Sequence, residues 1–218
     1  MVKPKFVYWN AASRAQNAML MFHVTNKEYE WDSDTANKWP TSKSVMPFGQ
    51  LPVFYDEDNN LIAQSNAITH YSARICGLMP NMAYDIAKVD MLVEQSTDIF
   101  NLMTKCKYAG DDNAVVKAWK EFKEKKLDEK LLPLNNMLNE NFYGGDVPNA
   151  ADVCVFSVIN LVVRAGVKDC LLQYPKLYEH YKRMIEQGTV KEYLMSNVPT
   201  YFVFKDKVDV EKSSSVSN

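Results

Sequence analysis

The sequence predicts an α/β module of four strands followed by an all-helical module. Within the first eighty residues, short strand-type runs alternate with helical patterns in the order β-α-β and then β-β-α. Beyond residue 82 strand-type runs nearly vanish, and long segments with apolar residues at helical spacing replace them. The chain of 218 residues is long enough to bury a substantial core.

This change of pattern sets the expected domain limits. We place the first domain at residues 1–78, a linker at residues 79–82 and the helical domain at residues 83–200. Residues 201–218 form a C-terminal tail, whose polar end is expected to be disordered.

The first module opens with a strand-type run at residues 5–9. From Arg14 onward apolar residues recur at helical spacing, and residues 28–31 suit a second strand. The polar stretch at residues 32–45 is expected to be irregular.

The most informative part of the first module lies around Pro52 and the pair Gln64-Ser65. A hairpin is expected at residues 53–63, and Pro52 stands at the start of its first strand, where proline is tolerated. Gln64 and Ser65 follow the second strand and open a helix that runs to about residue 76. Two polar groups at a helix N-terminus form a cradle for a carboxylate or a phosphate.

The second module is expected to consist of helices alone. Pro133 predicts a kink or break in the second of them. Asn149 and Asp152 predict a capping box at the start of the third, which is apolar nearly all round and should form the core. The expected helices span residues 83–107, 115–140, 150–164, 174–187 and 189–196.

Composition and charge exclude several classes of protein. The chain is 47% hydrophobic and 24% charged, with a net charge of -2 and a pI near 6.0, which gives no electrostatic reason to expect nucleic acid or an anionic membrane as partner. The longest apolar stretch, residues 153–163, is too short to span a bilayer. The start of the chain is charged and shows no signal peptide, so a cytoplasmic location is expected.

The cysteines and histidines show no spacing typical of a metal site, and no metal is expected. The sequence has no CxxC, and most cysteines lie in apolar helical patterns, which predicts buried free thiols in a reducing compartment. The three histidines suggest neither a ligand set nor a triad. They are expected in the core or at the surface: His23, His70 and His180.

Five motifs appear in a fixed order along the chain: Y-W-N-A-A-S-R-A, W-P-T-S-K, P-F-G-Q-L-P-V, A-Q-S-N-A-I and N-A-A-D-V. Together they resemble a cytosolic glutathione transferase over roughly residues 5–200. Within that family the chain is most similar to the sigma class, which includes haematopoietic-type prostaglandin D synthases and S-crystallins. The resemblance implies a thioredoxin-like N-terminal domain that binds glutathione, a helical domain that lines the pocket for a small electrophile, and a homodimer.

The resemblance also implies a catalytic pair. Tyr8 matches the family's catalytic tyrosine, and Arg14 matches the arginine that points at the glutathione sulfur from the first helix. A phenol hydrogen bond to the sulfur favours the thiolate, which then attacks the electrophile without a covalent enzyme intermediate.

Glutathione itself is expected to lie along the motifs that follow. Trp39 and Lys43 match the pair that holds its glycyl end. Gln50 and Leu51 match the stretch before a cis-proline, Pro52, with the backbone of Leu51 bonded to the cysteinyl part.

The remaining glutathione contacts come from two helices. Gln64 and Ser65 match the pair that grips the γ-glutamyl carboxylate, and Asp98 stands where related enzymes reach the glutathione amine of the partner subunit. Glu94 and Thr97 are neighbours of Asp98 on the same helix and are alternatives for that role.

Each of these residues also has a purely structural reading. A tyrosine at a strand end is usually the edge of a core, Trp39 alone suggests packing, and Lys43 alone suggests a solvated charge. Gln64 and Ser65 alone suggest a helix cap. The order of the motifs, rather than any single residue, favours the functional interpretation.

The chain departs from the family in the segment after Tyr8. The common pattern N-x-R-G-R-A-E reads N-A-A-S-R-A-Q here, so the first arginine, the glycine and the acid are replaced. Ser13 takes the place of the glycine and is expected to line the electrophile pocket. Lys105, Cys154 and Val158 stand nearest to the bulky aromatic pocket residues of prostaglandin D synthases, and none is aromatic, which argues against prostaglandin isomerisation.

The sequence therefore predicts a glutathione transferase that conjugates small, mostly hydrophobic electrophiles in detoxification. Two alternatives stay open: a glutathione-dependent peroxidase or isomerase, and a non-catalytic structural protein or ligand carrier. A thioltransferase is disfavoured because it needs a cysteine at the end of the first strand, whereas the first cysteine here is Cys76.

Overall fold

The computed structural model describes residues 2–196, 198–199 and 202. Contacts divide these residues into two compact units, the first drawn from residues 1–89 and 184–201 and the second from residues 90–183 and 202 onward. The expected disordered end of the tail lies outside the described residues, and the expected linker at residues 79–82 stays a prediction.

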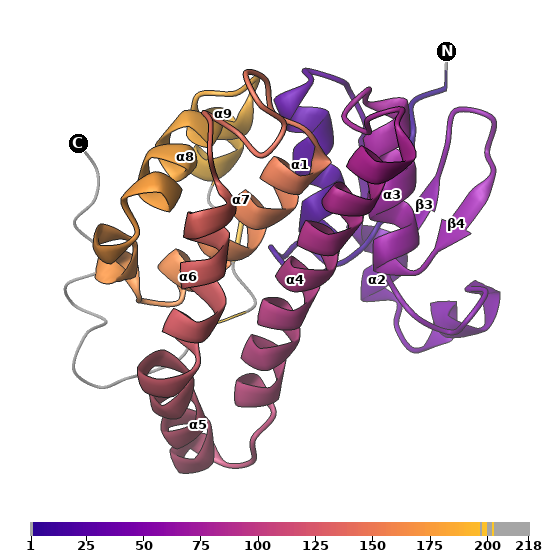
Figure 1. The fold of residues 1–218 in the computed structure, drawn as a ribbon. Coiled ribbons are helices and arrows are strands. Elements are labelled where there is room, and N and C mark those ends of the chain that lie inside the picture. The colour runs from indigo at the N-terminus through magenta and orange to yellow at the C-terminus, as the bar shows by residue number, and fades with distance from the viewer. Residues whose placement is uncertain (1, 197, 200–201, 203–218) are drawn as a thin grey trace. The chain divides into compact units, whose positions relative to one another are not determined.

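The first unit holds a sheet and the helices that pack with it (Figure 1). Its elements in chain order are β1 (Lys5–Val7), α1 (Gln16–Val24), β2 (Glu30–Asp32), α2 (Ser33–Asn37), the short 3-10 helix η1 (Thr41–Val45), β3 (Val53–Tyr55), β4 (Leu61–Ala63), α3 (Ser65–Ile75) and, from the end of the chain, α9 (Val190–Met195).

The sheet is mixed and has the strand order β2-β1-β3-β4. Strand β1 runs parallel to β2 and antiparallel to β3, and β3 pairs with β4 as the expected antiparallel hairpin. Phe6 lies at the centre of β1 and is fully buried, with its ring 4.7 Å from that of Phe54 and 5.5 Å from that of Phe22. The predicted thioredoxin-like arrangement is confirmed.

Most of residues 32–45 lies in two short helices, α2 and η1, rather than in irregular structure, which corrects the sequence-based expectation. Asp32 begins α2, because its carboxylate accepts a hydrogen bond from the backbone N–H of Thr35 at 2.8 Å and from the Thr35 hydroxyl at 2.7 Å. The capping signal was present in D-S-D-T, but the helix of five residues is too short to show an apolar period.

The β3–β4 turn is held by one buried carboxylate. Asp56 accepts hydrogen bonds from the backbone N–H of Asp58 and of Asn60, the Asn60 side-chain amide and the Tyr71 hydroxyl, at 2.8 to 3.0 Å. The bonds from the side chains of Asn60 and Tyr71 are the main reason that the pKa of Asp56 lies below its usual value.

We expect the variant Asp56→Asn to be less stable than the wild type at neutral pH. A lowered pKa means that the ionised carboxylate stabilises the fold above the unfolded-state pKa of about 4, and that this contribution is lost as the pH falls through the lower folded-state value. Melting temperatures of both proteins, measured between about pH 2 and pH 7, should therefore converge as the pH falls. A gap that stays constant over this range would contradict the role given to the charge.

Helix α9 is joined to α1 within the first unit. The His23 ring lies 2.8 Å through Nδ1 from the Thr189 hydroxyl and 2.9 Å through Nε2 from the Tyr29 hydroxyl, and the Thr189 N–H donates to the His23 carbonyl at 2.9 Å. Gly188 precedes this contact with a φ of +49°, and a Cβ there would stand 2.1 Å from the His23 carbonyl oxygen. Only glycine fits this approach.

The second unit consists of helices in the described part of the chain. Its elements are α4 (Ala83–Lys107), which begins in the first unit, α5 (Asp112–Lys125), α6 (Leu127–Met137), α7 (Ala150–Arg164), the 3-10 helix η2 (Lys168–Gln173) and α8 (Pro175–Ile185). No described helix is long and apolar enough to cross a membrane.

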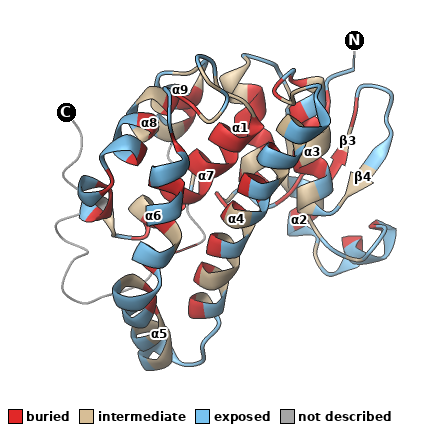
Figure 2. Cartoon of the chain, in the orientation of Figure 1, coloured by how far each residue is buried: buried red, intermediate tan, exposed pale blue. Residues whose placement is uncertain are grey.

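Helix α7 forms the core of this unit, as predicted, and is buried along almost its whole length (Figure 2). The predicted capping box is confirmed: Asn149 accepts from the N–H of Ala151 at 2.8 Å, and Asp152 accepts from the N–H of Asn149 at 2.9 Å.

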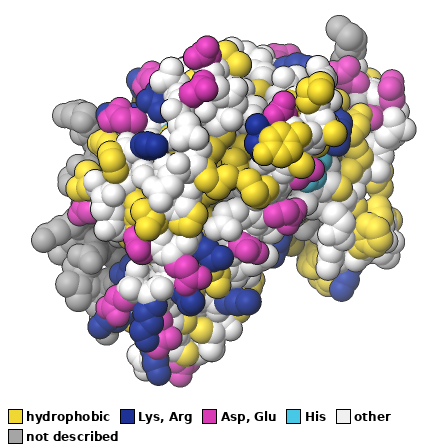
Figure 3. All heavy atoms as spheres, in the orientation of Figure 1, with side chains coloured by type: hydrophobic (Ala, Val, Ile, Leu, Met, Phe, Trp, Pro, Cys, Tyr) yellow, Lys and Arg dark blue, Asp and Glu magenta, His cyan; other side chains and the backbone are white. Residues whose placement is uncertain are grey.

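The second expected helix, residues 115–140, does break, but not where Pro133 suggested. Pro133 lies inside α6, and the chain instead breaks at Lys126, between α5 and α6. Asp128 and Glu129 occupy the first turn of α6, where carboxylates complement the helix dipole, so they mark a new start. Charges of both signs are interspersed over α5 and α6 on the face drawn in Figure 3.

Candidate functional site

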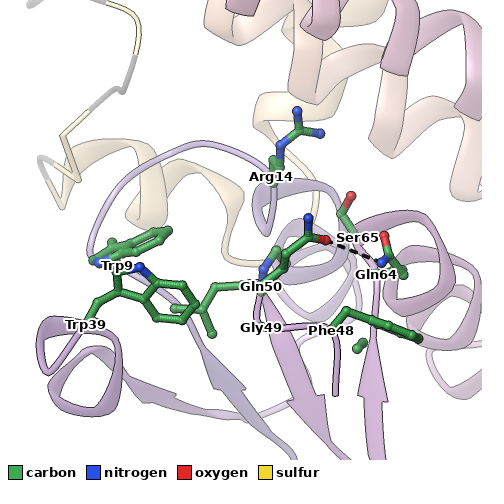
Figure 4. Close-up of a pocket in the computed structure, with 11 residues that line it drawn as sticks. Trp9, Arg14, Trp39, Phe48, Gly49, Gln50, Gln64 and Ser65 are labelled. Carbon is green, nitrogen blue, oxygen red and sulfur yellow. Dashed lines mark hydrogen bonds between the residues drawn. The ribbon is translucent and has the colours of Figure 1, made fainter. Parts of the chain in front are cut away.

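A pocket of about 450 Å³ opens within the first unit. It is lined from the end of β1, the first turn before α1, the segment before β3, and the start of α3 (Figure 4). The lining residues are Trp9, Arg14, Trp39, Phe48, Gly49, Gln50, Leu51, Pro52, Ala63, Gln64 and Ser65.

One side of the pocket is aromatic. The Trp9 and Trp39 rings meet edge to face with centroids 5.9 Å apart, and Figure 4 shows them side by side. Trp39 also packs on a small cluster formed by Val7, Met46 and Val53. Its indole is thus supported from the core and presented to the pocket.

The opposite side is polar and includes the start of α3. Gln64 precedes this helix with φ 74° and ψ 120°, a backbone conformation that L-residues rarely adopt. Its side-chain amide donates to the Gln50 side-chain carbonyl at 3.5 Å, drawn as the dashed line in Figure 4. Ser65 is the first residue of the helix.

The helix start is suited to an anion. The Gln64 side chain makes no capping hydrogen bond, and α3 has no acidic residue in its first turn. The first amides of a helix have no partner inside it and carry the positive end of its dipole. Since Arg14 lines the same pocket, a carboxylate here would meet both backbone donors and a cation.

The segment between these two sides supplies backbone groups. The Leu51–Pro52 peptide is cis, as the resemblance implied, and Leu51 lines the pocket beside it. A second cis bond, Trp39–Pro40, was not predicted. Both residues that precede the prolines are thus pocket residues.

Lys43 lies next to the pocket wall without lining it. A Cβ on Gly49 would stand 3.0 Å from the Lys43 Cε, and Gly49 has a φ of +57°. Glycine at this position therefore allows the lysine stem to pack over the wall. Gly49 was not among the predicted site residues, although it stands in the P-F-G-Q motif.

Tyr8 is buried directly behind the aromatic side, with 5% of its surface exposed, and does not itself line the pocket. Its ring centroid lies 5.3 Å from that of Trp9 and 6.4 Å from that of Trp31. Its backbone N–H donates to the Asp32 carbonyl at 3.3 Å, which fixes the end of β1 against β2.

The altered segment after Tyr8 makes a contact of its own. The backbone N–H of Ala12 donates to the Pro199 carbonyl at 2.7 Å, and the N–H of Gln16 donates to the Ser13 carbonyl at 2.9 Å. Ser13 is buried, and like Tyr8 it is absent from the pocket lining.

The other predicted site residues lie in the second unit. Cys154 and Val158 are buried in α7, with 0% and 2% of their surfaces exposed, and Lys105 is exposed on α4. Asp98 is exposed on α4, and its carboxylate stands 3.8 Å from the Lys130 ammonium.

Four lining residues were not predicted from the sequence: Trp9, Phe48, Gly49 and Ala63. Trp9 stands in the Y-W-N motif, and an apolar residue next to a strand end gives no separate signal of a binding role. Phe48 is 64% exposed, which is unusual for phenylalanine and is invisible in the sequence.

No thiol or metal cluster competes with this pocket among the described residues. All four cysteines are buried and free, as predicted, and burial raises the pKa of Cys76 and raises that of Cys170 to about 12. The described residues contain no group of three or more His, Cys, Asp or Glu that could hold a metal ion.

Comparisons with known proteins identify the family of the chain. A family model described as the glutathione S-transferase N-terminal domain matches residues 4–74, and one described as the glutathione S-transferase C-terminal domain matches residues 97–197. The chain belongs to the glutathione S-transferase family.

Several relatives match over nearly their full lengths. Glutathione S-transferase 4 of Caenorhabditis elegans is 29% identical over 197 residues, which are 87% of this chain and 94% of the relative. S-crystallin 4 of Enteroctopus dofleini is 24% identical over 210 residues, covering 89% and 97%. The orthorhombic crystal structure of NaGST1 superposes with a TM-score of 0.79 at 26% identity, covering 93% of this chain and 100% of that one.

Proposed function

We propose that this protein is a glutathione transferase of the sigma class, in which Tyr8 and Arg14 stabilise the glutathione thiolate for attack on a small, mostly hydrophobic electrophile. The observation that carries the proposal is the pocket, which combines an uncapped helix start, Arg14 and a cis-proline wall in a chain of this family.

The ends of glutathione fit the two sides of the pocket. The γ-glutamyl carboxylate would accept hydrogen bonds from the start of α3, with Gln64 and Ser65 beside it. The glycyl carboxylate would lie toward Trp39, with the Lys43 ammonium as its counter-charge. The backbone of Leu51 would hold the cysteinyl part between them.

Thiol activation is the chemical step that the chain has to supply. A free thiol of this kind has a pKa of about 8.5, so only a few per cent is ionised at pH 7. Lowering that value by about two units requires about 2.7 kcal/mol of preference for the anion. Two charge-assisted hydrogen bonds, from the Tyr8 hydroxyl and the Arg14 guanidinium, supply this amount at about 1.5 kcal/mol each.

The thiolate then attacks the electrophile directly, and either displaces a leaving group from it or adds to its double bond. A carbon–sulfur bond forms. In a displacement a halide or another leaving group departs, and in an addition the resulting carbanion takes a proton from water, so no group of the enzyme becomes covalently attached. This reaction would serve detoxification.

Retention on immobilised glutathione, followed by a conjugation assay with a chlorinated nitroarene, tests the proposal. Retention and conjugation together are expected. Retention with turnover of peroxides or isomerisable substrates alone would favour the peroxidase or isomerase alternative. Retention without any turnover would favour a non-catalytic structural protein or carrier, and absence of retention would overturn glutathione as the ligand.

We further propose a cytoplasmic homodimer in which Asp98 reaches the glutathione amine of the partner subunit. The exposure of the Asp98 side chain, 64%, supports this role because the carboxylate is accessible on α4. The mass of the retained protein in solution checks the assembly, since each chain contributes 25.0 kDa.

The rare backbone of Gln64 gives a prediction that separates binding from stability. In Gln64→Gly, relief of a conformation that costs about 1–3 kcal/mol should offset the greater freedom of glycine in the unfolded chain, so stability is unchanged or higher by about 1 kcal/mol. Glutathione binding should weaken about tenfold, because one charge-assisted hydrogen bond is lost.

The matched control is Asn59→Gly. Asn59 has a similar φ of 64° but lies in the exposed β3–β4 turn, away from the pocket. Its stability should change in the same sense, and its glutathione affinity should not change. Calorimetric binding and thermal unfolding of both variants provide the measurement, and equal affinities in the two variants would contradict the role of Gln64.

A further inference from the structure

Four aromatic rings form a continuous row from β2 to the pocket. Trp31 contacts Tyr8, Tyr8 contacts Trp9, and Trp9 contacts Trp39, with centroid distances of 6.4, 5.3 and 5.9 Å. All three contacts are edge to face, with interplanar angles of 90°, 62° and 72°. Edge-to-face pairs at such distances attract each other beyond their buried area.

Trp9 lies between two rings, Tyr8 and Trp39, that have different proposed roles. On one side it contacts Tyr8, the proposed thiol activator, and on the other Trp39, proposed to hold the glycyl end. Trp9 and Trp39 line the pocket, whereas Tyr8 does not.

The backbone around Trp9 is fixed independently of its side chain. The preceding N–H, of Tyr8, donates to the Asp32 carbonyl at 3.3 Å, and the Trp9 carbonyl accepts from the N–H of Ala11 at 2.7 Å in a tight turn. Trp9 is 37% exposed, and the Tyr8 and Trp39 rings contact its indole from two sides. A substitution of the side chain can therefore leave the turn in place.

Trp39 contacts the core on one side and Trp9 on another. Its indole packs on the cluster of Val7, Met46 and Val53, and its other neighbour in the aromatic row is Trp9. Removal of the Trp9 ring would remove the edge-to-face contact that restricts rotation of the Trp39 indole.

We propose that Trp9 is a positioning residue for glutathione recognition, which acts by holding the Trp39 indole in the orientation that binds the glycyl end. This role rests on the proposed function. It predicts that Trp9 contributes to affinity through Trp39 rather than through a contact of its own with glutathione.

A double-mutant cycle with Trp9→Ala, Trp39→Ala and the double variant tests this role, with glutathione binding measured by calorimetry. Trp9→Ala should weaken binding about three- to tenfold, the range of one aromatic pair. The double variant should bind within about twofold of Trp39→Ala alone, because the contribution of Trp9 needs Trp39. Trp9→Phe, which keeps a ring edge toward Trp39, should restore affinity to within about twofold of the wild type.

Two further readouts separate positioning from general loss of structure. The KM for glutathione should rise in Trp9→Ala, while kcat at saturating glutathione changes less than about threefold. Near-ultraviolet circular dichroism without glutathione should lose the same bands in Trp9→Ala and Trp39→Ala, since the two indoles form one coupled pair.

Trp31→Phe is the matched control. Trp31 contacts the other side of Tyr8, does not line the pocket, and its indole N–H has no hydrogen-bond partner among the described residues. Its glutathione affinity should match the wild type.

The outcomes distinguish the two proposals. Additive losses in the double variant, or unchanged affinity in Trp9→Ala, would overturn the positioning role while glutathione binding by the wild type stands. Failure of the wild type to bind glutathione would overturn the proposed function and this role with it.

Discussion

Replacing Tyr8 with phenylalanine is expected to lower kcat/KM for conjugation roughly 10- to 100-fold, while the Kd for glutathione stays within about twofold. The variant loses the hydroxyl that favours the thiolate but keeps the ring that packs between Trp9 and Trp31. The thiol pKa should return toward about 8.5. The loss of kcat/KM relative to the wild type should therefore be largest near pH 6 and shrink as the pH rises from about 6 toward about 8.5. The pH profile of kcat/KM measures both effects.

Tyr84→Phe serves as the control for loss of a tyrosine hydroxyl. Tyr84 is 75% exposed at the start of α4, and the Lys88 ammonium lies over its ring, a contact that phenylalanine keeps. Its turnover should equal that of the wild type. Near-normal turnover of Tyr8→Phe at pH 6 would remove Tyr8 from the mechanism.

Asp152→Ala is expected to produce the largest loss of stability. Its carboxylate is fully buried and accepts hydrogen bonds from the backbone N–H of Tyr143, Gly144 and Asn149, at 2.7, 3.1 and 2.9 Å. It also stands 2.8 Å from the Nε2 of the equally buried His180.

Removal of one partner of a buried charged or hydrogen-bonded pair costs about 3–5 kcal/mol, because the other groups are left without acceptors. In a chain of this size such a loss lowers the melting temperature by about 6–20 °C. Thermal unfolding monitored by circular dichroism measures it, and poor recovery of soluble protein is the extreme form of the same outcome.

Two further variants serve as references for the loss of stability in Asp152→Ala. Asn149→Ala removes only the other half of the capping box and should cost about 1 kcal/mol. Asp146→Ala removes an exposed carboxylate from the same loop and should change stability by less than about 0.5 kcal/mol. A loss for Asp152→Ala no greater than that for Asn149→Ala would show that the His180 contact and the loop amides contribute little.

The features predicted well were those encoded locally. Asn149 and Asp152 stand three residues apart, so the capping box and the start of α7 were visible in five consecutive letters. The same holds for Pro52 and for the strand-to-helix change at Gln64. His180 lies 28 positions from Asp152, and no local pattern indicates that the two side chains share a bond.

The features missed depend on neighbours distant in the sequence or on unusual backbone. Pro133 was expected to break a helix, yet the break at Lys126 follows from carboxylates that begin the next helix. Gly49 could be placed at the pocket only once its positive φ and the packed Lys43 stem were known. Trp9 gained significance only from its position between the rings of Tyr8 and Trp39.

The most direct test is a titration of the glutathione thiol on the protein, followed by the ultraviolet absorbance of the thiolate. The wild-type complex should ionise with a midpoint about two units below the free value of about 8.5, and the Tyr8→Phe complex should ionise close to the free value. A wild-type midpoint equal to that of free glutathione, or the same lowered midpoint in both complexes, would contradict thiol activation by Tyr8.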